Sequence, residues 1–286
     1  MKVPSPIKPT KLMPLYPTVF LAVFFLVPFV IMLAVSFFHR VEGAFFEPAF
    51  EFDNYLRVFD PFYLGILQFS ILLSSAAALL ATAIAFPFTY MITRMSRRSQ
   101  ILALVLLLAV LSLSEVIIGF AWSTLLSRTS GISNLFVALG LLEKPTSYYP
   151  SLPAVLIGLV YLSFPYAVLV LYPPLSRLDP ELPEAARMMG ASPSRTFFTI
   201  IVPLLRKPIM STLILVFVFT LGAYTLPQTL GKPSSWTVSV HITDQAIFQA
   251  NLPFAAAMAI FLLVVTLVMI AFTLLLDRNP PQGQTK

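Results

Sequence analysis

Residues 62–93 read FYLGILQFSILLSSAAALLATAIAFPFTYMIT and contain no charged side chain. An α-helix rises 1.5 Å per residue, so about 20 predominantly apolar residues are enough to cross the roughly 30 Å hydrocarbon core of a bilayer. The stretch exceeds that length, and soluble domains are not built from apolar runs of this kind. We therefore expect a transmembrane helix over residues 65–93.

Five further runs of the same character lie on either side of this stretch, and Glu115 is the only charged residue within them. They cover Leu12–Phe38, Ile101–Ser127, Pro145–Ser176, Pro208–Gly231 and Gln245–Leu276. We therefore expect an all-α, polytopic membrane protein in which residues 1–286 form a single transmembrane domain. The expected spans are about 15–38, 65–93, 101–126, 152–173, 208–230 and 254–276.

The composition of the 286-residue chain agrees with this fold class. Hydrophobic residues make up 58% of the chain and charged residues only 10%, whereas about a quarter of the residues in a soluble domain are charged. The chain has no cysteine, which excludes disulfides, thiolate metal sites and thiol nucleophiles. Its net charge of +6 does not indicate nucleic-acid binding, because the basic residues lie in short gaps between the apolar runs.

The distribution of basic residues predicts the orientation of the spans, because loops rich in Lys and Arg stay in the cytoplasm. With the N-terminus inside, 13 of the 18 basic residues lie in cytoplasmic segments. The outside loops hold only Arg40, Arg57, Arg128, Lys144 and Lys232. We therefore expect both termini in the cytoplasm.

The most informative segment between two runs is Leu178–Ile209, LDPELPEAARMMGASPSRTFFTIIVPLLRKPI, on the expected cytoplasmic side. Asp179 is suited to cap a first short helix with Pro180 in its first turn, and Gly190 to end that helix in a left-handed conformation. Ser192 is suited to cap a second helix. The segment thus predicts two short helices joined at a glycine.

Small and helix-limiting residues complete this segment. Pro193 occupies the first position of the second expected helix, and Pro203 limits that helix before the fifth span begins. Ala185 and Ala186 present a surface small enough for another protein to approach closely. The sequence therefore predicts that residues 178–209 form a docking loop.

The same segment resembles the EAA loop of permease subunits of type I ATP-binding-cassette (ABC) importers. The spaced identities are Glu184, Ala185, Ala186, Gly190, Ala191, Phe197, Ile200 and Pro203. The resemblance implies a coupling helix that sits in a groove of the ATP-binding subunit and transmits its closure to the membrane helices. The residues it assigns to ATPase coupling are Glu184, Ala185, Ala186, Gly190, Ala191, Phe197 and Pro203.

Three shorter segments resemble the first permease of spermidine/putrescine importers. They are Phe52–Tyr55, Val155–Tyr161 and Asn251–Phe254. The chain departs from that branch at residues 252–255, where it has Leu-Pro-Phe-Ala in place of Trp-Pro-Phe-Gly, and at Gln228, where the branch has an acidic residue. The resemblance implies a path for a polyamine or a similar small cation. An amino acid derivative, a phosphonate or a ferric ion is the alternative solute.

The chain lacks the phosphate-binding loop that ATP hydrolysis needs. The only Gly-Lys pair, Gly231-Lys232, has Leu226 where the first glycine of GxxxxGK should stand and is followed by Pro233. We therefore expect no cofactor in this chain, with ATP and Mg²⁺ bound by partner subunits. The resemblance implies a second permease subunit, two ATP-binding subunits and an extracytoplasmic solute-binding protein, assembled in the bacterial cytoplasmic (inner) membrane.

No residue pattern indicates an enzyme. His39 and His241 lie at opposite ends of the chain without metal-ligand spacing, and neither a Ser/His/Asp order nor a carboxylate pair is present. A polytopic membrane enzyme is therefore disfavoured. An ion-coupled secondary transporter is the other alternative, and a single intramembrane carboxylate beside an EAA-like loop argues against it.

Glu115 is the only acidic residue inside an expected span, where an ionised side chain costs about 2.5 to 3.5 kcal/mol. Three interpretations stay open: a structural hydrogen bond or ion pair within the complex, a contact along the solute path, and a position near the membrane interface. Trp122, seven residues further on, and Tyr224 would supply cation–π surface for an amine. We take Glu115, Trp122 and Tyr224 as candidate residues of the substrate path.

Overall fold

The fold, obtained as a computed structural model, is helical throughout the residues that the structure describes, which are 15–41, 43, 45–129, 131–179 and 181–276. Within these ranges no strand occurs, and the only β-type pairing is an isolated bridge between His39 and Glu47. The expectation of an all-α fold is confirmed.

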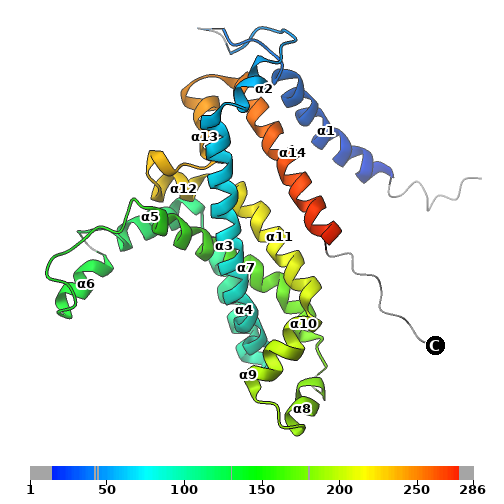
Figure 1. The fold of residues 1–286 in the computed structure, drawn as a ribbon, viewed down its shortest axis with the longest axis vertical. Helices are drawn as coiled ribbons and strands as arrows, with labels where there is room; N and C mark the ends of the chain where they lie inside the picture. The colour runs from blue at the N-terminus through cyan, green and yellow to red at the C-terminus, as the bar shows by residue number, and fades with distance from the viewer. Residues whose placement is uncertain (1–14, 42, 44, 130, 180, 277–286) are drawn as a thin grey trace, which may run out of the picture. The chain divides into compact units, whose positions relative to one another are not determined.

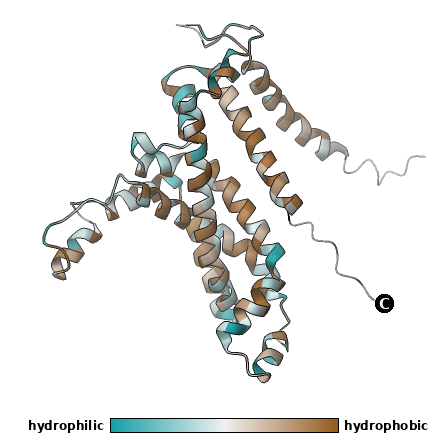
Figure 2. Cartoon of the chain, in the orientation of Figure 1, coloured by the Kyte–Doolittle hydropathy of each residue, from teal (hydrophilic) through white to brown (hydrophobic). Residues whose placement is uncertain are grey.

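Among the described residues, four helices are long and apolar enough to cross a membrane; Figure 1 shows their arrangement along the chain. They are α1 (Leu15–Val35), α3 (Pro61–Thr93), α7 (Leu152–Ser176) and α14 (Leu252–Leu276). Figure 2 shows hydrophobic residues dominating α1 and α14 along their length. Two bent helix pairs raise the number of candidate spans to six if each pair is one span, as the sequence predicts.

The third expected span is not one continuous helix. α4 (Arg97–Leu111) and α5 (Glu115–Leu125) meet at an angle of 95°. The break contains no proline, and Ser114 caps α5 by accepting a hydrogen bond from the backbone N–H of Val116 at 3.3 Å. Glu115 therefore lies in the first turn of a helix, where the helix dipole favours a negative charge, and not in the middle of a helix.

The fifth expected span, 208–230, is also divided. α11 (Arg206–Leu221) ends before Gly222, and a separate short helix, α12 (Thr225–Leu230), follows. α12 packs against α5 and α7. A Cβ atom on Gly158 of α7 would lie 2.7 Å from Leu230 Cδ1, so this glycine permits the close approach of α12.

Contacts divide the chain into two compact units, residues 1–60 with 242–263 and residues 61–241 with 264–286. The first contains α1, α2 (Asp53–Val58) and the beginning of α14. In this unit the guanidinium of Arg57 lies 4.4 Å from the ring centroid of Phe254. The expectation of a single transmembrane domain over the whole chain stays a prediction.

The second unit is built around α3, α7 and α11, which pack on one another. Alanines 77, 78, 81 and 85 of α3 are buried, and small residues of this kind let helix backbones approach closely inside a membrane. The remaining short elements of this unit are α6 (Ile132–Ala138), α8 (Glu181–Met188), α9 (Pro193–Thr196), α10 (Val202–Leu204) and a 3₁₀ turn η3 (Pro233–Ser235). α13 (Val238–Thr243) begins in this unit and ends in the first.

Candidate functional site

The segment 178–209 forms two short helices joined at Gly190, as its sequence predicts. Gly190 has φ of +86°, in the left-handed region that favours glycine. Its N–H donates to the Arg187 carbonyl at 2.9 Å, and the N–H of Ala191 donates to the Ala186 carbonyl at 3.1 Å. This pair of bonds is a Schellman motif, which closes the C-terminus of α8.

Both expected capping residues make their bonds. The N–H of Glu181 donates to Asp179 Oδ1 at 3.0 Å, and the N–H of Arg195 donates to Ser192 Oγ at 3.3 Å. Pro180, expected in the first turn, lies outside the described residues. The two caps and the glycine turn thus define where the two short helices begin and where the first one ends.

The second helix of the loop changes its geometry along its length. α9 passes into a π-helical segment, η2 (Phe197–Ile201), and then into α10. A bend of 74° at Leu205 separates this helix from α11. The sequence does not predict the π-helical segment, which carries one of the expected coupling residues, Phe197.

Phe197 anchors the loop to the C-terminal end of α3. Its ring lies 5.4 Å from that of Phe86 and 5.6 Å from that of Tyr90, between ring centroids. The neighbouring Ile201 is 1% exposed. Aromatic and aliphatic side chains of the loop are therefore packed directly against α3.

The outer surface of the loop differs from the expectation in one respect. Glu184 and Ala185 are exposed, but Ala186 is 8% exposed and faces inward, so the two alanines do not share one docking surface. Met188 and Met189 are 89% and 88% exposed instead. The sequence analysis did not identify these methionines as part of the outer surface. The different directions of Ala185 and Ala186 follow from helix geometry, because successive residues of an α-helix are 100° apart.

The other two expected coupling residues lie at the ends of this surface. Ala191, half-buried, follows the Gly190 turn, and Pro203, exposed, lies in α10. The structure thus brings Glu184, Ala185 and the glycine turn to one exposed end of the loop. Phe197 belongs to the buried side that contacts α3.

The candidate path residues do not form one cluster. Trp122 packs edge-on against Tyr161 with ring centroids 5.5 Å apart. The two rings line a cavity of about 350 Å³ whose other lining residues are Leu113, Ile117, Ile118, Ala121 and Leu125. Neither Glu115 nor Tyr224 belongs to this lining. The position of Tyr161 in the stretch that resembles the polyamine permease is the one sequence signal that pointed to it.

Tyr224 lies at the start of α12, where its carbonyl accepts a hydrogen bond from the N–H of Gln228 at 3.1 Å. α12 packs on α5, and a Cβ atom on Gly119 would lie 3.3 Å from Thr229 Cγ2. The short helix that Tyr224 begins is therefore in contact with the helix that Glu115 begins.

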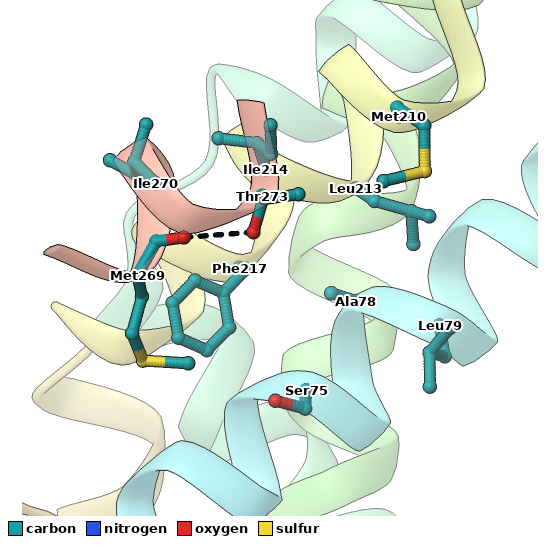
Figure 3. Close-up of a pocket in the computed structure, with 10 residues that line it drawn as sticks. All are labelled: Ser75, Ala78, Leu79, Met210, Leu213, Ile214, Phe217, Met269, Ile270 and Thr273. Carbon is teal, nitrogen blue, oxygen red and sulfur yellow. Dashed lines mark hydrogen bonds between the residues drawn. The ribbon is translucent and has the colours of Figure 1, made fainter. Parts of the chain in front are cut away.

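A separate cavity of about 240 Å³ lies among α3, α11 and the second half of α14 (Figure 3). Its lining is apolar except for Ser75 and Thr273, and the Thr273 hydroxyl already donates to the Met269 carbonyl at 2.8 Å. None of its ten lining residues is charged. The cavity therefore offers no counter-charge to a cationic solute.

Of the two histidines, His39 lies in the loop after α1 and pairs with Glu51, with Nδ1 and Oε2 2.9 Å apart. The hydrogen bond and the negative charge of Glu51 raise the pKa of His39 above its ordinary value. Within the part of the chain that the structure describes, no three His, Cys, Asp or Glu side chains come together as a metal site would require.

Comparisons of the sequence and of the fold with known proteins both find transport proteins. Residues 100–280 match the model of a family described as "binding-protein-dependent transport system inner membrane component". The chain is 29% identical over 245 residues to the spermidine/putrescine transport system permease protein PotB of Escherichia coli K12, which covers 86% of this chain and 89% of that protein.

Two solved structures are similar in fold. A bacterial ABC transporter involved in the import of alginate superposes with a TM-score of 0.76 over 96% of this chain and 98% of that one, at 20% identity. The alginate transporter in complex with a periplasmic protein carrying an alginate pentasaccharide gives a TM-score of 0.72 over 93% of each chain, also at 20% identity.

Proposed function

Because the chain belongs to the family of binding-protein-dependent transport system inner membrane components, and is thus a multi-pass permease subunit of an ABC importer and not an enzyme, we propose that it lines the import path of a polyamine. The class of the solute rests on one observation, the 29% identity to a spermidine/putrescine permease over 86% of the chain. A similar small cation fits the same proposal.

The aromatic pair of Trp122 and Tyr161 supports a cationic solute. An ammonium over an aromatic face gains about 0.5 to 2 kcal/mol, which is enough for a transient contact without halting release. Glu115 begins the helix that carries Trp122, so its carboxylate and the Trp122 ring belong to one element. We expect Glu115, Trp122 and Tyr224 to meet the solute at successive points of the path.

Loop 178–209 is the part of the chain that couples transport to ATP hydrolysis in this proposal, with both termini and the loop in the cytoplasm. Glu184, Ala185 and the exposed methionines form the surface for an ATP-binding subunit. The Phe197 contact with Phe86 and Tyr90 passes the movement of the loop to α3. The whole chain, residues 1–286, acts as one transmembrane domain.

The assembly that this function requires contains a second permease, two ATP-binding subunits and an extracytoplasmic solute-binding protein. The solved alginate transporter, which is in complex with a periplasmic binding protein, is the structural precedent for the last of these. ATP and Mg²⁺ are bound by the ATP-binding subunits, since this chain has no phosphate-binding loop.

The test is uptake by proteoliposomes that contain the complete transporter. Labelled spermidine or putrescine should accumulate with ATP inside, and an excess of an amino acid derivative, a phosphonate or ferric ion should not compete. Glu115→Gln keeps size and hydrogen bonding but removes the charge, so uptake should fall while assembly and basal ATPase activity stay near wild type. Glu143→Gln, the same change at an exposed loop position, is the control.

Two results would contradict the proposal at different levels. Uptake of a neutral or anionic solute in place of the polyamine removes the assigned solute class. Unchanged polyamine uptake by the Glu115→Gln variant removes this residue from the path and leaves the solute class intact.

A further inference from the structure

A cavity of about 300 Å³ with three charged side chains in its lining lies between the first helix of loop 178–209 and the C-terminal end of α3. Tyr90 of α3 and Arg94, which directly follows α3, form one wall, and Pro183, Glu184 and Arg187 of α8 form another. Pro193 and Thr196 of α9 complete the lining. The cavity is thus built by the end of α3 and by two short helices that lie much further along the chain.

Its charges favour a monoanion. Two guanidinium groups and one carboxylate leave a single positive charge in the lining. Arginine presents a planar fork of donors that matches phosphate oxygens, often in a bidentate manner. A phosphodiester carries one negative charge and balances this lining, whereas a nucleoside triphosphate brings several.

Thr196 provides a second and independent indication. The residue is 2% exposed, and its hydroxyl has no hydrogen-bond partner among the described residues. Most buried hydroxyl groups in proteins are hydrogen-bonded, so a missing partner needs an explanation. A phosphate oxygen in the cavity that Thr196 lines is an acceptor for this proton.

The position of the cavity fits the membrane surface. Arg94 directly follows the last residue of α3, a candidate membrane span, and the proposed orientation puts this end of the helix on the cytoplasmic side. Arg97 and Arg98 are the first two residues of α4, which follows shortly after Arg94. Basic clusters at the cytoplasmic end of a transmembrane helix attract anionic lipids.

We propose that this cavity is a regulatory site that binds a phosphate group, supplied by the headgroup of an anionic phospholipid, and that the bound group holds the coupling loop against α3. The regulatory role rests on the proposed function, because it requires the loop to face the cytoplasm and to contact the ATPase. The binding itself does not require transport. Arg94 and Arg187 approach the phosphate from α3 and α8, so binding links the two elements directly.

The experiment measures lipid binding to the delipidated, detergent-purified transporter. Short-chain phosphatidylglycerol, short-chain phosphatidylcholine and inorganic phosphate are titrated separately, and bound lipid is counted by native mass spectrometry. The variants are Arg94→Gln and Arg187→Gln. Arg195→Gln is the matched control, because Arg195 lies in the same loop, is exposed and does not line the cavity.

Phosphatidylglycerol should bind to the wild type and to Arg195→Gln with equal affinity. Each of the other two variants loses a charge-assisted hydrogen bond, so binding should weaken by about 10- to 100-fold. Arg94→Lys and Arg187→Lys keep the charge and should recover part of the affinity. Thermal unfolding of every variant shows whether the fold is retained, and a variant that unfolds is replaced by its lysine counterpart.

The proposal is overturned if all variants bind phosphatidylglycerol with the same affinity as the wild type. It is also overturned if the wild type binds phosphatidylcholine as tightly as phosphatidylglycerol. Inorganic phosphate that displaces the lipid with the same dependence on Arg94 and Arg187 supports the phosphate site and identifies its source as solution. ATPase activity with and without phosphatidylglycerol is recorded separately. If lipid binding depends on the arginines but ATPase activity does not respond, the site stands and the regulatory role fails.

Discussion

At the scale of single residues, Gly190 carries the sharpest structural requirement of the coupling loop. Its φ of +86° is a conformation that L side chains adopt at a cost of about 1 to 2 kcal/mol, and the two bonds of the Schellman motif hold it there. Open space surrounds the position where a Cβ atom would stand, so a substitution acts through backbone strain and not through a clash. The direction in which α8 leaves the turn therefore depends on this residue.

Gly190→Val should lower solute uptake strongly, because the strained turn misplaces Glu184 and Ala185, the residues proposed to contact the ATP-binding subunit. Gly140→Val is a matched control: Gly140 also has a positive φ, +73°, and also has open space around the missing Cβ, but it lies outside the loop. Uptake, membrane insertion and copurification of the ATP-binding subunit are measured for both. Wild-type uptake by Gly190→Val would remove the coupling role of the turn.

His39 gives a prediction of pH dependence. Glu51 raises the pKa of His39, so the contribution of this pair to stability is fully present below the unfolded pKa of about 6.5 and is lost as the pH rises through the folded pKa. Both side chains are well exposed, at 58% and 40%, so the contribution is small. Glu51→Gln should bring the pKa of His39 back towards its ordinary value.

NMR titration of the imidazole protons tests this shift. The chain has two histidines, and the His39→Gln variant assigns the signals. Glu143→Gln is the control and should leave the titration unchanged. An unaltered pKa of His39 in Glu51→Gln would show that the pair does not form in solution.

At the scale of elements, capping side chains decide where the helices end. Ser114 separates α4 from α5 by capping the second helix, and the pair bends by 95° in a run that contains neither proline nor glycine at the break. The prolines inside the long helices, Pro28 and Pro87, do not interrupt α1 and α3. Within a membrane run, a serine that bonds to the backbone ahead of it can therefore be a stronger boundary than a proline.

Ser114→Ala should destabilise the protein by about 1 kcal/mol, the typical cost of removing an N-cap side chain. Ser112→Ala is the control, because the Ser112 hydroxyl donates to the Leu108 carbonyl within α4 and such bonds do not stabilise a helix. Thermal unfolding of the purified transporter in detergent measures both. Equal unfolding temperatures for Ser114→Ala and the wild type would show that the cap does not set the boundary.

The sequence predicts the long helices because uninterrupted apolar runs can satisfy their backbone only as helices in a bilayer. It predicts the Gly190 turn because glycine, serine and aspartate have distinct local chemistry. It does not predict the break at Ser114 or the end of α11 at Leu221, because each lies inside an apolar run that is long enough to span a membrane as one helix. Nor does it predict the contact of Trp122 with Tyr161, which depends on how separate helices pack.

At the scale of the whole molecule, the distribution of basic residues predicts an orientation that labelling can test. Single cysteines are introduced at the exposed positions Ser96 and Ser234, and because the chain has no native cysteine each variant carries one thiol. A membrane-impermeant maleimide should label Ser234→Cys in intact cells and Ser96→Cys only after the membrane is permeabilised. Labelling of Ser96→Cys in intact cells would reverse the orientation and place the coupling loop outside.

The π-helical segment η2 sets the rotational phase between the coupling surface and the membrane helices. A π-helical turn holds one residue more than an α-helical turn, and each residue of an α-helix turns the chain by about 100°. The surplus residue keeps Phe197 turned towards Phe86 and Tyr90 while Phe198, 68% exposed, faces away. Deletion of Thr199 would therefore leave a regular helix but rotate the first half of the loop by roughly a quarter turn. The backbone would stay intact, and a different face of the loop would point towards the proposed ATP-binding subunit.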